Sequence, residues 1–445
     1  MDNKNRPNIL FLFPDQLRFD WIGNNLDLPI RTPYLDQLQQ AGMTFPKTIC
    51  ASPLCAPSRA TLASGKEYDR CPVKDNQDDY PLNEYTFYRQ LRESGYHVLG
   101  CGKFDLNKGA CTSGQSAWGL DGKRFLTEWG FSDGINNEGK MDGVNSSRDK
   151  PQGPYMQYLE EKGLRQRHIQ DFDQRRGREG TTFPTPLPDV SYCDNWIGQN
   201  GLNLIDSVPI GQPWFLQVNF TGPHAPMDIT KSMAELYRNE VFPLPNDDKI
   251  PAETHQAIRR NYAAMIENID RWIGLYLGAL EKRGDLSNTL IVFSSDHGEM
   301  LGDRGRWGKG DPYHPSVSVP LVVSGPKVGR QVVSTLPTTI LDLTATFLEY
   351  AGLEIPEEMD SSSLKSLLEA QTDVHRNYVF SGLKKWRLVY DGRYKLISNW
   401  QKDSLLFDTE IDPNELNDLA LNQKYQDHLN RLNQQMETHK LNTTS

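Results

Sequence analysis

The sequence contains no hydrophobic run long enough to cross a membrane. Its longest apolar stretches, such as residues 9–13 and the segment around residues 289–293, fall far short of the roughly 20 residues that a membrane-spanning helix needs. The first residues also lack an apolar core followed by a small-residue cleavage site, the pattern of a secretory signal. These absences predict a protein without a membrane partner, cytoplasmic as written, or periplasmic if a leader has been removed.

Positive charge is not in excess either. The 445 residues include 48 Lys and Arg against 58 Asp and Glu, which gives a formal net charge of -10. A general nucleic-acid binder needs a basic face that neutralises phosphates, so we expect no nucleic-acid partner. If the substrate is an anion, the positive charge that binds it must be local.

Cysteine is scarce, and the six cysteines include no C-x-x-C pair. This spacing argues against a zinc site, and a chain of this length does not need a disulfide framework. Apart from Cys55, the cysteines are expected to be buried structural residues: Cys50, Cys71, Cys101, Cys111 and Cys193.

Short apolar runs typical of strands alternate with helical patterns through most of the chain. This alternation predicts an α/β fold with a large, mostly parallel sheet flanked by helices. Residues 109–188, rich in Gly, Asp, Asn, Arg and Pro, are predicted to form a long, partly irregular excursion that shapes a substrate site. The predicted strands are residues 8–13, 96–101, 214–220, 289–294 and 319–323, and the predicted helices start at Thr32 or span residues 86–93, 192–205, 253–282 and 337–350.

The pattern changes near residue 370. Short apolar runs at residues 378–381, 386–390, 394–398 and 405–407, separated by tight turns such as Asp391-Gly392, predict a smaller antiparallel sheet. Asp412-Pro413 is predicted to open a C-terminal helical segment. We therefore expect a catalytic α/β domain over residues 1–365 and a C-terminal α+β subdomain over residues 366–445.

Polar side chains of catalytic type follow several of the predicted strands. In open α/β sheets, ligands bind beyond the carboxyl ends of the strands, so these side chains are expected to meet at one edge. Any one of them alone could be a turn or capping residue, but their coincidence favours a site. The residues concerned are Asp15, Gln16, Lys103, Asp105, His224, Asp296 and His297.

Part of this set has the chemistry of a metal site. The carboxylates of Asp15 and Asp296 and the side-chain carbonyl of Gln16 are hard oxygen ligands that suit Ca²⁺ or Mg²⁺. His297 adds a nitrogen, which is unusual for a purely structural calcium site. The combination predicts a metal that contacts a reacting group.

Cys55 is the exception among the cysteines. Pro57 and Ser58 can start a helix, which places Cys55 just before its N-terminus, an electropositive position that suits a nucleophile or an anion. The alternative is another buried structural cysteine.

The segment Cys55-Ala56-Pro57-Ser58-Arg59 matches C-x-P-S-R, the signature by which sulfatases mark a cysteine for oxidation to formylglycine. The chain resembles the formylglycine-dependent (type I) sulfatases of the alkaline-phosphatase superfamily. The likeness runs nearly end to end and includes residues 95–103, 222–226, 295–299, 308–310, 393–397 and 412–415.

The resemblance implies a role for each matching residue. Cys55 becomes the formylglycine nucleophile, made by a maturation enzyme, and Arg59 holds and polarises it. Lys103, His224 and Lys309 surround the sulfate, with His224 as general acid, and His314 is added as a predicted substrate-binding residue. The divalent metal is usually Ca²⁺ in this family, with Mg²⁺ as the alternative. It would be bound by Asp15, Gln16, residue 55, Asp296 and His297.

The resemblance also implies the order of the chemistry. One hydroxyl of the hydrated aldehyde attacks sulfur in line with the leaving alcohol. The second hydroxyl then loses its proton, sulfate is expelled, and the aldehyde returns.

Two departures from the family pattern affect the site. Gln16 stands where sulfatases often have Asp, which removes one negative charge and predicts weaker metal binding. Asp105 stands where the family commonly has His, two residues after Lys103. We expect Asp105 to take over the proton transfer that regenerates the aldehyde, and a substrate-binding role is an equal alternative.

The favoured substrate is a small sulfated mono- or oligosaccharide. Trp118, Trp129 and Trp307 could stack on sugar rings or simply pack in the core. Basic residues at 165–167 and 175–178 could meet a polyanionic glycan or form a solvated helix face. Two other functions stay open: a phosphonate or phosphate monoester hydrolase of the same superfamily, and a non-catalytic glycan-binding protein if Cys55 is not matured.

Overall fold

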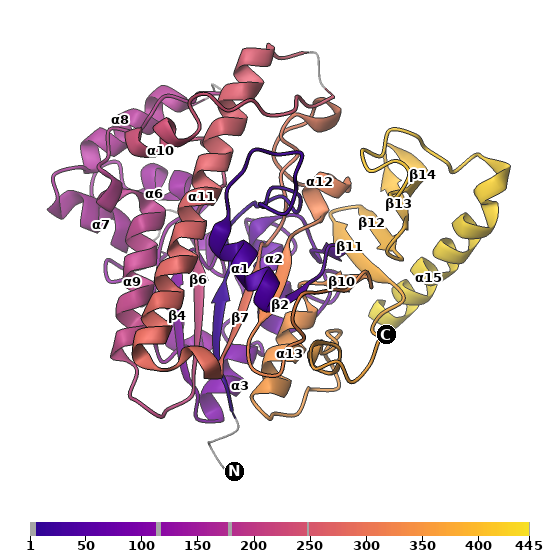
Figure 1. Cartoon of the computed structure of the whole chain (residues 1–445), viewed down its shortest axis with the longest axis horizontal. Coiled ribbons are helices and arrows are strands. Elements are labelled where there is room, and N and C mark those ends of the chain that lie inside the picture. The colour runs from indigo at the N-terminus through magenta and orange to yellow at the C-terminus, as the bar shows by residue number, and fades with distance from the viewer. Residues whose placement is uncertain (1–5, 113–116, 177–179, 247–248, 445) are drawn as a thin grey trace.

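The computed structural model describes residues 6–112, 117–176, 180–246 and 249–444. Figure 1 shows a large sheet with helices on both faces, and a smaller sheet beside it that carries the long C-terminal helix. This arrangement confirms the predicted fold class.

The main sheet has eight strands in the order β5-β4-β6-β1-β7-β8-β2-β9. Only β8 runs antiparallel to its neighbours, so the sheet is mostly parallel, as predicted. The strands are β1 (Asn8–Leu12), β2 (Gly42–Thr44), β4 (His97–Gly102), β5 (Asp133–Asn136), β6 (Trp214–Asn219), β7 (Thr289–Ser294), β8 (Leu321–Ser324) and β9 (Val332–Val333).

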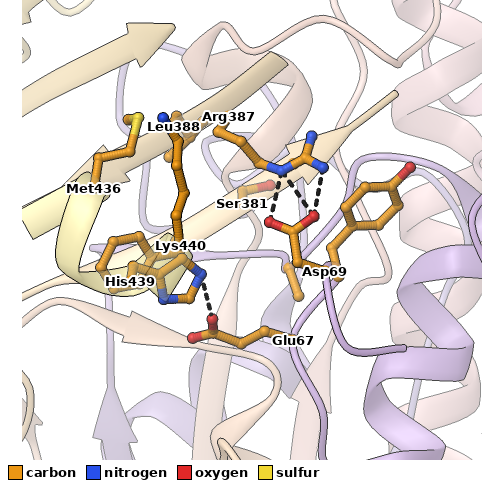
Figure 2. Close-up of a pocket in the computed structure, with 12 residues that line it drawn as sticks. Glu67, Asp69, Ser381, Arg387, Leu388, Met436, His439 and Lys440 are labelled. Carbon is orange, nitrogen blue, oxygen red and sulfur yellow. Dashed lines mark hydrogen bonds and ion pairs between the residues drawn. The ribbon is translucent and has the colours of Figure 1, made fainter. Parts of the chain in front are cut away.

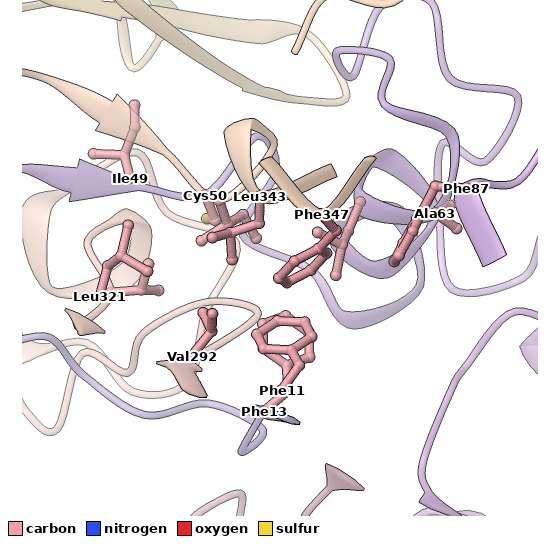
Figure 3. Close-up of a cluster of buried hydrophobic side chains, with 14 of the residues drawn as sticks. Phe11, Phe13, Ile49, Cys50, Ala63, Phe87, Val292, Leu321, Leu343 and Phe347 are labelled. Carbon is pink, nitrogen blue, oxygen red and sulfur yellow. The ribbon is translucent and has the colours of Figure 1, made fainter. Parts of the chain in front are cut away.

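Strand β1 lies at the centre of the sheet and is buried on both faces. Because successive side chains of a strand point to opposite faces, Phe11 and Phe13 join one core cluster and Leu10 and Leu12 join another. Figure 3 shows the first cluster, with Phe11 near Phe347. On that face lie α2 (Cys55–Ser64), α3 (Phe87–Glu93) and α13 (Asp342–Tyr350), and on the other α1 (Pro33–Ala41), α9 (Cys193–Ser207) and α11 (Ala252–Arg283).

The segment predicted as a partly irregular excursion is more regular than expected. Its strand β5 extends the main sheet, and Phe172 and Ile169 bury one face of α8 against the second core. The apolar residues of α8 are few and are separated by charged residues, so the sequence pattern did not indicate a helix here. The helices here are α4 (Lys108–Thr112), α5 (Leu126–Trp129), α6 (Lys140–Ser146), α7 (Pro154–Glu161) and α8 (Arg165–Arg175), and α10 (Lys231–Leu236) lies further along the chain.

The helix predicted over residues 337–350 starts later than expected. Its first residues form strand β10 (Thr338–Thr339), which pairs with β3 (Thr48–Ile49) in a two-stranded sheet. The Thr48 and Thr338 hydroxyls share a hydrogen bond of 2.7 Å. This long-range pairing overrides the helical pattern.

The C-terminal sheet is antiparallel and four-stranded, as predicted. Leu388 and Ile397 belong to the first core cluster, whereas Val389 and Leu396 pack with Leu432 of the last helix. The division into residues 1–365 and 366–445 stays a prediction. The elements are β11 (Val379–Leu383), β12 (Trp386–Tyr390), β13 (Tyr394–Trp400), β14 (Lys402–Asp408) and α15 (Gln426–Thr444), preceded by the short α14 (Lys365–Leu368) and α12 (His314–Val317).

The end of α15 is joined to the loop after α2 by a charged contact (Figure 2). His439 lies 2.9 Å from a carboxylate oxygen of Glu67 and stacks on Phe380 at 3.9 Å. Burial opposes protonation of His439, but the hydrogen bond and charge of Glu67, with the charges of Asp69 and Asp360, raise the pKa of the imidazole above its usual value. This ion pair connects the C-terminal helix to the loop after α2.

The contact should make stability depend on pH. Because the folded-state pKa of His439 is raised, its stabilisation is complete below the unfolded pKa of about 6.5 and is lost as the pH rises through the folded pKa. We expect His439→Gln to lower the free energy of unfolding by about 1 kcal/mol at pH 5.5 and by much less at pH 9. Thermal or urea unfolding across this range measures the difference. Glu67→Gln should show the same trend, and a difference that stays constant with pH would contradict the assignment.

Four of the five expected structural cysteines, Cys50, Cys71, Cys101 and Cys193, are buried and free, as predicted. The side chain of the fifth, Cys111, lies outside the described residues. Among the described residues, none of the helices combines the length and the apolar character that crossing a bilayer requires.

Candidate active site

The strand-end residues come together because their strands are neighbours. The order β4-β6-β1-β7 places the carboxyl ends of these four strands side by side at one edge of the sheet. Gly102 permits a close approach there: its φ is +109°, and a Cβ atom would lie 2.0 Å from the carbonyl oxygen of Asn219. The next residue, Lys103, donates its backbone N–H to the same oxygen at 3.1 Å.

Cys55 is the first residue of α2, one position inside the helix rather than just before it as the sequence predicted. Every residue of this helix is buried, and its mostly small side chains fit between the sheet and α13. The backbone N–H of Ala56 donates to the Asn76 side chain at 3.0 Å. The Cys55 Sγ atom lies 3.2 Å from His297 Nε2 and 3.7 Å from Asp15 Oδ1. The motif cysteine therefore faces the predicted metal ligands.

The surroundings of Cys55 favour a negative charge on it. Burial and the Asp15 carboxylate raise the pKa of the thiol, but Lys103, Lys309 and His297 outweigh them and hold it well below its usual value. The site is therefore built to stabilise an anion at position 55.

Arg59 lies one turn further along α2 and connects the two buried carboxylates. Its Nε donates to Asp296 Oδ2 at 2.9 Å and its Nη2 to Asp15 Oδ2 at 3.3 Å. Its Nη1 donates to the Lys103 carbonyl oxygen at 2.5 Å. Arg59 thus fixes the carboxylates relative to the helix that carries Cys55.

Asp15, Cys55, Asp296 and His297 form a buried group whose potential ligand atoms all lie within 4.8 Å of one another. Burial and the nearby Asp15 raise the pKa of Asp296, although His297 and Arg59 partly oppose this, as expected for two carboxylates held close together. A divalent cation would relieve the repulsion between them, and the carboxylate oxygens suit Ca²⁺ or Mg²⁺. The residues present fit a metal.

Gln16, the fifth predicted ligand, adjoins this group. Its backbone N–H donates to Asp296 Oδ1 at 3.0 Å, and its φ of +68° places it in the left-handed region. Its side-chain Oε1 accepts a hydrogen bond of 2.5 Å from Lys309, and its Nε2 donates to Glu299. Its role as a ligand stays a prediction.

The three predicted sulfate-binding residues surround the same space. Lys309 Nζ lies 2.5 Å from His224 Nε2, while His224 Nδ1 lies 2.5 Å from the Ala225 carbonyl oxygen. This pairing assigns the proton to Nδ1 and leaves Nε2 as acceptor. Burial and Lys309 lower the pKa of His224. Lys103 completes the set through its ion pair with Asp15.

Residues 7–353, the greater part of the chain, match the profile of the family described as "Sulfatase". The chain belongs to the sulfatase family. A second profile, described as "N-sulphoglucosamine sulphohydrolase, C-terminal", matches residues 302–442 of this sulfatase.

Individual relatives agree with this assignment. An arylsulfatase of Clostridium perfringens is 27% identical over 468 residues, covering 96% of this chain and 93% of its own. An N-acetylglucosamine-6-O-sulfatase of Bacteroides thetaiotaomicron is 26% identical over 484 residues, covering 93% of this chain and 82% of its own. A protein solved in complex with its substrate D-glucosamine-2-N,6-O-disulfate shares the fold, with a TM-score of 0.78 at 19% sequence identity. The match covers 99% of this chain and 98% of that protein.

Asp105 of this sulfatase is held by two cations. Its Oδ2 lies 3.0 Å from Lys103 Nζ and 2.8 Å from Lys108 Nζ, and Lys108 also pairs with Asp142 at 3.1 Å. Burial opposes its ionisation, but the two lysines lower the pKa of Asp105. Lys108 was not identified from the sequence, although its position three residues after Asp105 was a usable signal.

Two residues without a role predicted from the sequence hold the loops of Lys309 and His224 in place. Glu299 accepts hydrogen bonds from the Gln16 side chain and, at 2.5 Å, from the Gly308 backbone, so it connects the metal group to the loop of Lys309. Lys140 Nζ donates to the His224 carbonyl oxygen at 3.1 Å. Glu299 lies within a motif that the sequence singled out, but no local signal marks Lys140.

The predicted substrate-binding residue His314 lies apart from this cluster. Its Nδ1 is 3.0 Å from the Ser318 hydroxyl, and its ring packs edge-on to Phe19 at 4.8 Å. Burial, Lys395 and Arg18 hold its pKa well below the usual value. Within the described chain, no hydrogen bond or ion pair connects it to Cys55 or its neighbours, and its role stays a prediction.

Proposed function

We propose that this sulfatase hydrolyses the sulfate ester of a sulfated mono- or oligosaccharide, using a formylglycine made from Cys55 and a divalent metal, Ca²⁺ or Mg²⁺. The observation that carries the proposal is the burial of Cys55 at a helix start, with Asp15 and His297 within 3.7 Å of its sulfur. The relatives named for sulfated sugars support the substrate class.

Formylglycine and metal, when present, supply the nucleophilic oxygen and the positive charge that polarises the ester. Arg59 holds Asp15 and Asp296 in place, and Lys103 and Lys309 donate hydrogen bonds to the sulfate oxygens as their charge changes. When Lys309 turns to the sulfate, His224 Nε2 is released and, once protonated, gives its proton to the departing alcohol oxygen. The lowered pKa of His224 makes its protonated form a stronger acid but a less populated one, so this step requires prior protonation of Nε2.

The function can be tested with matured enzyme on parallel substrates. Free sulfate, phosphate and phosphonate release is measured from aryl sulfate, aryl phosphate and aryl phosphonate, and sulfate release from a panel of sulfated sugars. We expect the sulfate esters to be turned over fastest. Faster phosphonate or phosphate release would favour the other hydrolase of the superfamily, and sugar binding without any turnover by matured protein would favour a glycan-binding protein.

Asp105 takes the place of the family's histidine in regenerating the aldehyde. Its second partner, Lys108, offsets the charge that would otherwise repel sulfate, so the carboxylate can stay in the site. Its φ of +53° turns the chain sharply between Lys103 and Lys108.

An Asp105→Asn variant separates proton transfer from substrate binding. If Asp105 is the base, the variant should release alcohol in a burst and then stall with sulfate bound to residue 55, lowering kcat by about a hundredfold. Rapid-mix kinetics and mass spectrometry of the trapped protein measure both effects. Asp142→Asn, which changes only the outer partner of Lys108, is the matched control. A higher KM for the sugar substrate with no trapped sulfate would instead show that Asp105 binds substrate.

A further inference from the structure

A pocket of about 500 Å³ opens directly beside the sulfate-binding residues. Gln16, His224, Glu299 and Gly308 form the end that adjoins the site. Its volume lies within the range of about 300–1,000 Å³ that is typical of small-molecule sites. A sulfate ester held by His224 and Lys309 would therefore place its alcohol part in this pocket.

The rest of the pocket wall is largely apolar. Phe172 and Ile258 are buried, and Trp307 is half-buried beside them. The indole of Trp307 stacks on the His255 ring with a centroid distance of 5.4 Å and an interplanar angle of 10°. Its position is thus fixed, whereas Trp118 and Trp129 are buried in the core, as the packing alternative predicts. An anchored aromatic ring suits the apolar face of a sugar ring.

Two consecutive arginines line the same pocket but differ in their surroundings. Arg175 is buried, and its guanidinium donates to Asp171 at 2.9 Å and to the Phe183 carbonyl oxygen at 2.7 Å. Arg176 is exposed, and its guanidinium donates to the neutral side chain of Asn145. Among the described residues, no carboxylate forms an ion pair with Arg176. The charge of Arg175 is already neutralised by Asp171. Arg176 interacts only at longer range with Asp173, which itself pairs with Arg148, so its guanidinium can still meet a ligand.

This local positive charge stands out in a chain with a net charge of -10. Of the basic residues that the sequence singled out at 175–178, Arg178 lies outside the described residues. Arg165 is buried and bonded to Glu160 and backbone carbonyls, and Arg167 lies in a different surface cleft. Arg176 is therefore the residue of these clusters that can meet a second anion in this pocket.

We infer, on the basis of the proposed function, that the substrate is a saccharide with at least two anionic groups. Trp307 packs against the sugar ring that carries the cleaved sulfate, and Arg176 binds a second sulfate or a carboxylate on the far side. Trp307 and Arg176 are then specificity-determining residues. A guanidinium can pair with either anion through two parallel hydrogen bonds.

The test compares kcat/KM for three kinds of substrate with matured enzyme: 4-nitrophenyl sulfate, monosulfated sugars, and their counterparts with a second sulfate or a carboxylate. We expect the dianionic sugars to be the best sugar substrates. Arg176→Gln should lower kcat/KM for them about fivefold more than for the monosulfated sugars. Arg167→Gln, on α8 but in the other cleft, should leave all three unchanged.

Trp307 is tested with two variants because a truncated side chain could disturb the neighbouring loop. Trp307→Ala should lower kcat/KM for sugars and for 4-nitrophenyl sulfate about tenfold or more, and Trp307→Phe should restore most of it. The inference is overturned if monosulfated sugars are preferred, if Arg176→Gln affects all substrates equally, or if only the aryl sulfate is cleaved. Absence of turnover on 4-nitrophenyl sulfate as well would instead contradict the proposed function.

Discussion

Replacing Cys55 with alanine should reduce sulfate release by at least about a thousandfold, because under the proposed function it removes the side chain from which the nucleophile is made. No other described side chain takes its place at the start of α2 between Asp15 and His297. Free sulfate from an aryl sulfate measures the loss. Peptide mass spectrometry of wild-type protein co-expressed with a maturation enzyme should find formylglycine at position 55, together with higher turnover.

Cys71→Ala is the control for this experiment. Cys71 is also buried, with burial raising the pKa of its thiol to about 11, but it does not belong to the metal group. The control should lose some stability through the small cavity and keep its turnover. Full activity of Cys55→Ala would disprove the nucleophile assignment.

Removal of divalent metal should have the second largest effect, lowering turnover by about a hundredfold or more. Asp15 and Asp296 are both completely buried beside residue 55, so their repulsion is not screened by water. Ca²⁺ or Mg²⁺ added to the chelated enzyme should restore activity. It should also raise the melting temperature, because a cation that binds only the folded state stabilises it.

Asp296→Ala provides a readout that does not depend on activity. This variant should lose the rise in melting temperature with added Ca²⁺ and bind less metal in elemental analysis. Asp142→Asn, which removes a half-buried carboxylate outside the metal group, should keep both. Full activity without metal, or a normal response of Asp296→Ala to Ca²⁺, would refute the site.

The sequence by itself determined the fold class and the centre of the site. The apolar run of β1 indicated a strand buried on both faces, because its burial depends on residues that are adjacent in the chain. The polar residues after β1, β4, β6 and β7 indicated a shared edge, because parallel strands end on the same side of a sheet. The contiguous C-x-P-S-R motif indicated a candidate nucleophile, Cys55, which lies at the start of α2.

The tertiary structure alone decided which of the remaining residues reach the site. Glu299 meets Gln16 across 283 positions of the chain, and Lys140 meets His224 across 84. The neighbouring residues Arg175 and Arg176 look alike in sequence, yet Asp171 neutralises only the first. Such differences depend on which distant or facing groups a side chain meets after folding, and neither periodicity nor local spacing encodes them.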